Sequence, residues 1–229
     1  MPLSSTSKKA KWITSRFILA LVLFLVILFV FVAITDEIVL EHENGFDQNI
    51  FHAISFLVSP FMTRLMETVT FFGSSNFLFP AYVSLVIYYL VKRKIKPALD
   101  ITMIGLGTTG ILNLLKYIFQ RQRPLDPLIR DVTGFSFPSG HSFASFTFFG
   151  LIIYILWKTG IKKPFKILLS IILFLFAAII AFSRAYLRVH YPSDVVAGFC
   201  LSIIWLMLSL WILRKVDKKT SPGLEKFGP

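Results

Sequence analysis

The chain has 229 residues, of which 55% are hydrophobic and only 16% are charged, and its formal net charge is +12. A soluble domain carries about a quarter charged residues, so this composition argues against a soluble enzyme. The positive charge would suggest a nucleic-acid partner in a soluble protein, but in so apolar a chain it has another explanation, given below. The single cysteine, Cys200, leaves no disulfide framework and no thiolate metal site.

Six long runs contain no Asp, Glu, Lys or Arg, and each is near the roughly 20 residues that a helix needs to cross a bilayer. The runs are Phe17–Ile34, Thr68–Val91, Ile101–Leu115, Ser142–Trp157, Ile167–Ser183 and Val195–Leu213. The third run is short and reaches spanning length only with its flanking residues. Buried helices of a soluble core rarely lack charge on every face. We therefore expect an all-α integral membrane protein, a bundle of six transmembrane helices.

The first run follows four basic residues, as the apolar core of a cleaved signal peptide would. It is longer than such a core, and it ends in Val32-Ala33-Ile34, which is a poor cleavage site. We interpret it as an uncleaved signal anchor. The whole chain is then one integral membrane domain, with residues 1–16 as the N-terminus, 17–213 as the six-helix core and 214–229 as the tail.

Basic residues gather on alternate connections of the expected bundle. If the N-terminus is cytoplasmic, 17 of the 24 Lys and Arg residues lie on that side of the membrane. The positive-inside rule then places both termini in the cytoplasm. The other seven lie at or near the outer face, where the rule disfavours them, so something other than topology must require them. They are Arg64, Lys116, Arg121, Arg123, Arg130, Arg184 and Arg188.

Residues 36–67 form the first outer segment. Apolar side chains from Phe46 to Leu65 recur every three or four residues, which predicts a helical stripe, and Pro60 should bend or interrupt it. We expect one or two short helices lying along the outer interface. The segment could form a lipid-facing flap near the site, or it could pack over the bundle.

Three outer segments in the second half of the chain carry basic residues, histidines and one aspartate. They begin at Lys116, which is followed by Arg123-Pro124; at Pro138-Ser139-Gly140-His141; and at Ser183-Arg184, which is followed by His190 and Asp194.

Fixed cations at one membrane face repel metal ions and attract an anion, and an Arg fork matches phosphate oxygens. Backbone N–H groups at a helix start also favour an anion. The pattern therefore predicts a phosphate-binding site formed by Lys116, Arg123, Ser139, Gly140 and Arg184.

Two histidines can supply the nucleophile and the proton that phosphoryl transfer requires. His190 lies four residues before Asp194 at the start of the sixth helix, so the carboxylate can hold one ring nitrogen and leave the other to attack phosphorus. His141 has no such carboxylate nearby in sequence and is left as the general acid. The predicted catalytic residues are thus His190, His141 and Asp194.

The three segments resemble the signature of the type 2 phosphatidic acid phosphatase family, in which Lys and Arg-Pro, then Pro-Ser-Gly-His, then Ser-Arg, His and Asp follow at fixed spacing. The match extends over residues 116–194, and the six-helix layout extends it across most of the chain. The resemblance implies hydrolysis of a lipid phosphate through a phosphohistidine at His190, with no metal and no other cofactor. It also implies that His141 later helps to activate water.

In size and layout the chain resembles bacterial phosphatidylglycerophosphatase B and related undecaprenyl diphosphate phosphatases. The expected partners are therefore membrane lipids, with a phospholipid or polyprenyl phosphate as substrate, no nucleic acid and no obligate protein partner. Phosphatidylglycerophosphate ranks first, undecaprenyl diphosphate second, and broad action on phosphatidic acid is a further alternative. We expect the active site at the extracytoplasmic face. Arg121, Arg130 and Arg188 are left out of the core site, since headgroup binding alone could explain each of them and the sequence does not determine their roles.

Three other functions compete with this hypothesis. A transporter or anion channel usually places its charged site near the midplane and has repeated halves, whereas here the charges lie at one face. A non-catalytic lipid-binding protein would need the cations but not the paired histidines with Asp194. A vanadium haloperoxidase has a similar site, but those enzymes are soluble.

Overall fold

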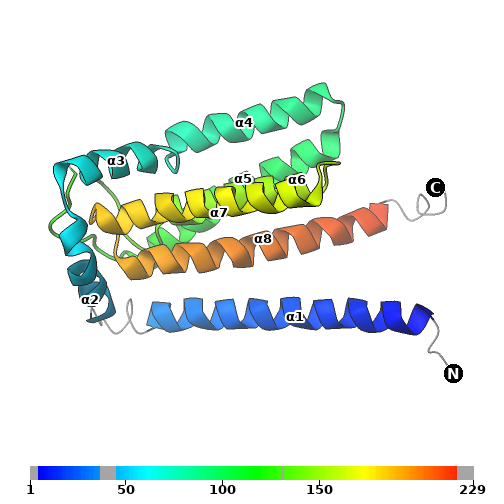
Figure 1. Ribbon diagram of the computed structural model, residues 1–229, viewed down its shortest axis with the longest axis horizontal. Helices are drawn as coiled ribbons and strands as arrows, with labels where there is room; N and C mark the ends of the chain where they lie inside the picture. Colours follow the sequence, from blue (N-terminus) through cyan, green and yellow to red (C-terminus); the bar gives the residue numbers. More distant parts are fainter. Residues whose placement is uncertain (1–4, 37–44, 130–131, 221–229) are drawn as a thin grey trace.

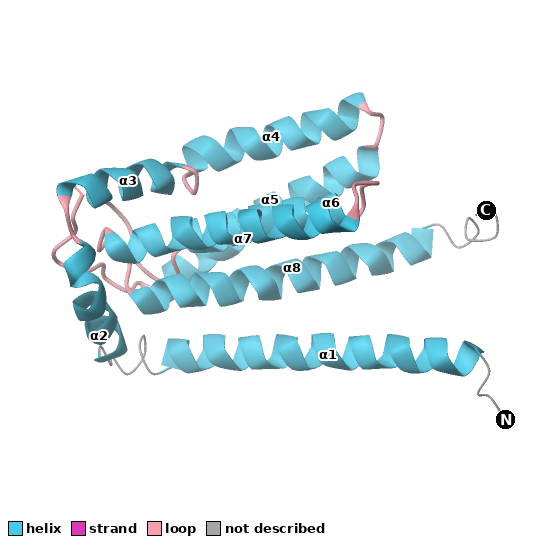
Figure 2. Ribbon diagram, in the orientation of Figure 1, coloured by secondary structure: helices cyan, strands magenta, loops and turns pink. Residues whose placement is uncertain are grey.

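The computed structural model describes residues 5–36, 45–129 and 132–220. Within these ranges every regular element is a helix (Figure 2). Arg130 and residues 37–44, which hold several acidic side chains of the first outer segment, lie outside the described residues.

The long helices run side by side along the longest axis of the molecule (Figure 1). They are α1 (Ser5–Ile34), α4 (Ser75–Val91), α5 (Ile95–Phe119), α6 (Gly140–Trp157), α7 (Lys163–Tyr186) and α8 (Pro192–Thr220). The shorter elements are α2 (Gly45–Ile54), the 3₁₀ turn Ser55–Leu57 and α3 (Pro60–Phe71). Within the described ranges this is the all-helical membrane bundle expected from the sequence.

Five helical segments are long and apolar enough to cross a membrane: Pro60–Val91, Ile95–Phe119, Gly140–Trp157, Lys163–Tyr186 and Pro192–Lys215. The first expected span corresponds to Ile18–Ile34, a shorter apolar part of α1. Large apolar side chains point outward from several helices. Phe29, Leu106 and Phe165, for example, are 72%, 69% and 59% exposed. Such a surface fits lipid as the solvent, and the chain is a multi-pass membrane protein.

The second expected span, Thr68–Val91, lies within the candidate span Pro60–Val91, and the structure adds a short turn at residues 72–74 that divides this span into α3 and α4. Gly73 occupies this break. A Cβ atom added there would lie 2.5 Å from Ile180 Cγ2 and 3.0 Å from His141 Cδ2, so only a glycine backbone can approach α6 and α7 this closely. The break therefore brings the end of α3 against the outer ends of those helices.

The first outer segment contains the short helices that its periodicity predicts, α2 and α3. Pro60 is the first residue of α3, and Ser59 caps the helix by accepting a hydrogen bond from Met62 N at 3.3 Å. In Figure 1, α2 lies across one end of the bundle. Its placement at a membrane interface stays a prediction.

The core of the bundle is α6, which packs against α7 and α8, while α1 packs against α8 and α4 against α5. Close contacts between helices rely on small residues, as is common in lipid. Gly107 of α5, for example, faces Trp205, whose ring would lie 2.2 Å from an added Cβ. The outer ends of α5 to α8 and the loops that join them gather beside α2, at the end away from the start of α1 and the end of α8 (Figures 1 and 2).

Candidate active site

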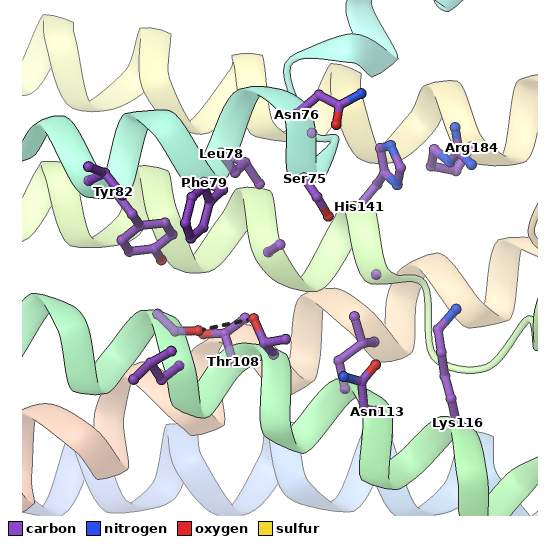
Figure 3. Close-up of a pocket in the computed structure, with 18 of the residues that line it drawn as sticks. Ser75, Asn76, Leu78, Phe79, Tyr82, Thr108, Asn113, Lys116, His141 and Arg184 are labelled. Carbon is purple, nitrogen blue, oxygen red and sulfur yellow. Dashed lines mark hydrogen bonds between the residues drawn. The ribbon is translucent and has the colours of Figure 1, made fainter.

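A cavity of about 1010 Å³ opens at this end of the bundle. Its lining includes the cations Lys116, Arg123 and Arg184 and both histidines of the predicted site, His141 and His190. Lys116 comes from the last turn of α5, His141 from the first turn of α6 and Arg184 from the last turn of α7 (Figure 3). Residues far apart in the sequence thus face one space, as the motif spacing predicts.

His190 and Asp194 form a buried pair, with 2% and 0% of their surfaces exposed. His190 Nδ1 lies 3.6 Å from Asp194 Oδ2. The Ser136 hydroxyl lies between them, donating to Asp194 Oδ2 at 2.5 Å and lying 3.4 Å from His190 Nδ1. Tyr191 N donates to the same carboxylate oxygen at 2.9 Å. The carboxylate is therefore fixed on the Nδ1 side, which leaves Nε2 for the cavity.

Burial lowers the pKa of His190 to about 4, and the nearby carboxylate of Asp194 only partly opposes this. Arg123 and Arg184 lower the pKa of His190 further through their positive charges. At neutral pH the ring is therefore uncharged, which is the form with a lone pair for attack. His190 Nε2 lies 3.3 Å from Arg123 Nη1.

The Arg123 guanidinium is fixed by backbone carbonyls. It donates to Gly134 O at 2.9 Å, to Thr133 O at 3.1 Å and to Val189 O at 2.5 Å. Burial lowers the pKa of Arg123 from its ordinary value. An oriented but poorly solvated cation beside the histidine attracts an anion.

The other two cations each keep bonding capacity for a ligand. Lys116 Nζ donates to Phe135 O at 2.7 Å, and Arg184 Nη1 donates to Thr70 Oγ1 at 2.8 Å. Arg184 is 5% exposed, and its Nε has no hydrogen-bond partner in the described structure. A buried donor without a partner is costly, so a bound phosphate oxygen would stabilise it.

The two small residues of the predicted phosphate site behave differently. Gly140 is the first residue of α6 and lines the cavity, so the start of that helix faces the ligand space. Ser139 is fully buried, and its hydroxyl accepts from Ser142 N at 3.4 Å as the helix cap. The side chain of Ser139 is not part of the cavity lining, and its contact with phosphate stays a prediction.

His141 projects into the cavity from α6 (Figure 3). The edge of its ring packs beside Gly73, so the break between α3 and α4 determines how much room the ring has. No carboxylate bonds to His141 among the described residues, whereas His190 lies beside Asp194. The two histidines therefore have the unequal surroundings that different catalytic roles require.

Sequence reasoning missed a second set of buried polar residues. Arg121, which the sequence left outside the core site, has only 9% of its side chain exposed, and it forms ion pairs with Asp47 at 2.9 Å and with Asp194 at 2.7 Å. Headgroup binding therefore does not explain Arg121, because its guanidinium points into the protein. Asp47, fully buried, comes from α2, and no motif signalled it. Ser136 likewise lies in a loop without a recognisable pattern.

Arg188 lies elsewhere, on a smaller hollow of about 390 Å³ lined also by Phe51, His52 and Asp126. Its guanidinium carbon lies 6.0 Å from the centre of the Phe51 ring, and its backbone has a φ of 54°. Arg188 therefore lies apart from the cations that line the main cavity.

The main cavity continues from the cations into a groove between α4 and α5. Its walls include Phe79 and Val83 of α4 and Leu106 of α5, which are 70%, 39% and 69% exposed. From Lys116 to Ile101 the lining extends over 15 residues of one helix, or about 22 Å. A polar end beside an apolar groove of that length fits an amphipathic ligand.

No three His, Cys, Asp or Glu side chains within the described ranges lie close enough together to hold a metal ion. The charged lining of the cavity is instead cationic. The site chemistry therefore suits an anion rather than a hard cation, which prefers several oxygen ligands.

A family model described as the PAP2 superfamily matches residues 97–218. Phosphatidylglycerophosphatase B of Bacillus subtilis is 33% identical over 178 residues, which cover 75% of this chain and 85% of that protein. Undecaprenyl-diphosphatase of Sulfolobus acidocaldarius is 28% identical over 212 residues, covering 85% of this chain and 94% of that one.

Two solved structures are also similar. The crystal structure of a transmembrane PAP2 type phosphatidylglycerolphosphate phosphatase from Bacillus subtilis has a TM-score of 0.69 and 29% identity, and the match covers 86% of this chain and 96% of that one. The crystal structure of Aquifex aeolicus LpxE has a TM-score of 0.54 and 28% identity, covering 72% of this chain and 94% of that one.

Proposed function

Because the chain belongs to the PAP2 superfamily and is a membrane-embedded lipid phosphatase, we propose that it hydrolyses phosphatidylglycerophosphate to phosphatidylglycerol through a phosphohistidine at His190. The observation that carries this proposal is the His190–Asp194 pair, which faces a cavity lined by three cations. A non-catalytic lipid-binding protein would have no need of a buried carboxylate behind a histidine.

The first half of the reaction transfers the phosphoryl group to the enzyme. Lys116, Arg123 and Arg184 bind the phosphate oxygens, and the start of α6 at Gly140 adds backbone donors. His190 Nε2 attacks phosphorus, the bond from phosphorus to the lipid oxygen breaks, and His141 donates a proton to that oxygen. Asp194 and Ser136 stabilise the positive charge that develops on the His190 ring.

The second half releases inorganic phosphate. His141, now unprotonated, accepts a proton from a water molecule as its oxygen attacks phosphorus. The bond between phosphorus and His190 Nε2 then breaks, and the ring returns to its neutral form. Both proton transfers use the same histidine, so the cycle closes with no net change in the enzyme.

The groove favours a glycerolipid over a polyprenyl chain as the leaving group. Two amides in its lining, Asn76 and Asn113, make no hydrogen bond within the described part of the chain, and the buried Tyr82 hydroxyl is also unpaired. Tyr82 lies six residues further along α4 than Asn76, about 9 Å deeper. A polyprenyl chain offers no acceptor at that depth, whereas ester carbonyls of a glycerolipid do, and unpaired polar groups in lipid are costly.

Undecaprenyl diphosphate is the second candidate, because the relative from Sulfolobus acidocaldarius carries that activity in its name. Sidedness also bears on the choice. The connections at 92–94 and 158–162 lie at the same end of the bundle as the start of α1 (Figure 1), and all carry basic residues. With that end in the cytoplasm, the site faces outward. Undecaprenyl diphosphate appears in the outer leaflet, whereas phosphatidylglycerophosphate would have to cross.

A single detergent assay decides the substrate. Purified phosphatidylglycerophosphate, undecaprenyl diphosphate and phosphatidic acid are compared by phosphate release, with His190→Ala as the inactive reference. We expect the highest kcat/KM on phosphatidylglycerophosphate. Tyr82→Phe should lower that value about tenfold, the size of one lost hydrogen bond, and leave undecaprenyl diphosphate hydrolysis unchanged. A higher kcat/KM on undecaprenyl diphosphate would reverse the ranking.

A further inference from the structure

A buried chain of charges joins α2 to the candidate active site. Asp47 in the first turn of α2 is fully buried. One of its oxygens accepts from Ser193 N at 2.8 Å, and the other accepts from Ser193 Oγ at 2.7 Å and from Arg121 Nη2 at 2.9 Å. Among the described residues, this carboxylate thus bonds to Ser193, which directly precedes Asp194, and to Arg121, which pairs with Asp194.

Arg121 lies between two carboxylates. While Nη2 donates to Asp47, Nη1 donates to Asp194 Oδ1 at 2.7 Å and to Ser193 Oγ at 2.9 Å. The guanidinium carbon also lies 4.0 Å from the centre of the Tyr191 ring, which holds the flat group in one plane. Arg121 follows directly on Gln120, the left-handed residue that ends α5 with a φ of 46°, so the turn aims its side chain inward.

The two oxygens of Asp194 are therefore divided between two tasks. Oδ1 bonds to Arg121, while Oδ2 faces His190 and accepts from Ser136 and Tyr191. Because both oxygens accept hydrogen bonds, the carboxylate resists rotation away from the imidazole. Residues in an active site usually keep their geometry through supporting hydrogen bonds of this kind.

The charges of the three residues also matter. Arg121 alone beside Asp194 would cancel the negative charge that His190 needs as its ring becomes positive. Asp47 shares the guanidinium, so the three side chains together keep one net negative charge next to the histidine. In a buried setting such a difference acts strongly, because little water screens it.

We propose that Asp47 and Arg121 are positioning residues for the reaction: they fix Asp194 toward His190 and preserve its negative charge, so that the seating of α2 on the bundle determines catalytic rate. This inference rests on the roles proposed above for His190 and Asp194. It gives the first outer segment a direct function, distinct from the flap or packing roles that its sequence left open.

The test uses the full-length protein in detergent, with any lipid phosphate that the wild type hydrolyses. Asp47→Asn is expected to lower kcat about 10- to 100-fold, the usual cost of removing a partner behind a site residue. KM should change less than about twofold, because Lys116, Arg123 and Arg184 still bind the phosphate. Asp126→Asn is the matched control, since that carboxylate is exposed, lies outside the network and should leave kcat unchanged.

Variants of Arg121 test whether Asp47 and Arg121 act together on Asp194. Arg121→Gln should lose more rate than Arg121→Lys, which keeps a positive charge. The double variant Asp47→Asn/Arg121→Gln should be no slower than Arg121→Gln alone, because both act through Asp194. If Asp47→Asn does not fold, Arg121→Gln decides, and wild-type kcat in that folded variant overturns the proposal.

The controls separate this inference from the mechanism beneath it. A folded Asp47→Asn protein with wild-type kcat overturns the positioning role, even though His190→Ala is inactive. Activity in His190→Ala would instead overturn the phosphohistidine mechanism itself. A purely structural role for Asp47 would lower the thermal midpoint and leave kcat per folded molecule unchanged, and that result also overturns the proposal.

Discussion

The ionisation of His190 links its chemistry to its burial. Desolvation lowers the pKa of this side chain to about 4 in the folded protein, from an ordinary value of 6.5. Below pH 6.5 the unfolded chain therefore binds a proton that the folded chain does not. The stability contributed by the neutral ring is fully present above pH 6.5 and is lost as pH falls towards 4.

This sign gives a measurable prediction. Between pH 7 and pH 5 the thermal midpoint of the wild type in detergent should fall further than that of His190→Gln, which has no such proton to bind. Over this pH range the expected difference in unfolding free energy is about 2 kcal/mol, because the unfolded chain takes up close to one proton that the folded chain does not. If the thermal midpoints of the two proteins fall equally with pH, burial does not keep the His190 ring neutral in the folded protein.

The donor chemistry of the cavity gives a second prediction at this scale. Activity should survive EDTA and should be inhibited by vanadate, because the cationic lining suits a five-coordinate oxyanion and not Mg²⁺. The measurement is phosphate release after chelation, with and without added Mg²⁺. Loss of activity with EDTA that Mg²⁺ restores would contradict the metal-free mechanism.

The sequence predicted those site residues that belong to a motif, because a motif is recognised by its residue types and their spacing. Both histidines, Asp194 and the three cations face or adjoin one cavity because they occupy the outer ends of consecutive helices. Asp47 and Arg121 could not be found in this way. Asp47 stands among other acidic residues of an outer segment, and only the packing of α2 against the start of α8 shows that it is buried.

At the scale of elements, most of the candidate site residues lie in the first or last turns of helices. The apolar runs predicted the long helices well, because lipid demands uninterrupted apolar stretches. The break between α3 and α4 was not predictable, since residues 72–74 are as uncharged as their neighbours. It exists because Gly73 allows a contact with α6 and α7 that is visible only after folding.

This turn yields a third prediction, with a matched control. Gly73→Ala adds a methyl group where Ile180 and the His141 ring already lie, so His141 should shift and kcat should fall at least tenfold, as small misplacements in a site often cause. Gly110→Ala adds the same group in α5 with no atom within 4 Å and should stay within about twofold of wild type. Both are measured as phosphate release per folded protein. Equal kcat values would show that His141 tolerates the shift.

For the whole molecule, topology can be tested directly. We expect the site to face outward, with both termini in the cytoplasm. In a Cys200→Ala background, Leu125→Cys places a thiol on a loop residue that is 95% exposed at the site end. A membrane-impermeant thiol reagent should label it on intact cells stripped of any outer barrier.

Gly160→Cys, in the turn between α6 and α7 at the other end, is the matched control and should be labelled only after the membrane is broken. The reverse labelling pattern would place the active site on the cytoplasmic side. That outcome would also remove the objection that phosphatidylglycerophosphate has to cross the membrane before hydrolysis.

The bonds between Asp47 and Ser193 bear on how the protein is made. They join residues 146 positions apart, and the ion pair from Arg121 to Asp194 spans 73. Contacts between such distant residues close late, because the intervening chain has to be ordered first. A ribosome reaches Asp47 and Arg121 long before it reaches His190 and Asp194, so a growing chain holds this ion pair before the carboxylate that it positions exists. The protein therefore becomes able to hydrolyse its substrate only when α8 is in place, and a chain that stalls before α8 enters the membrane has no activity.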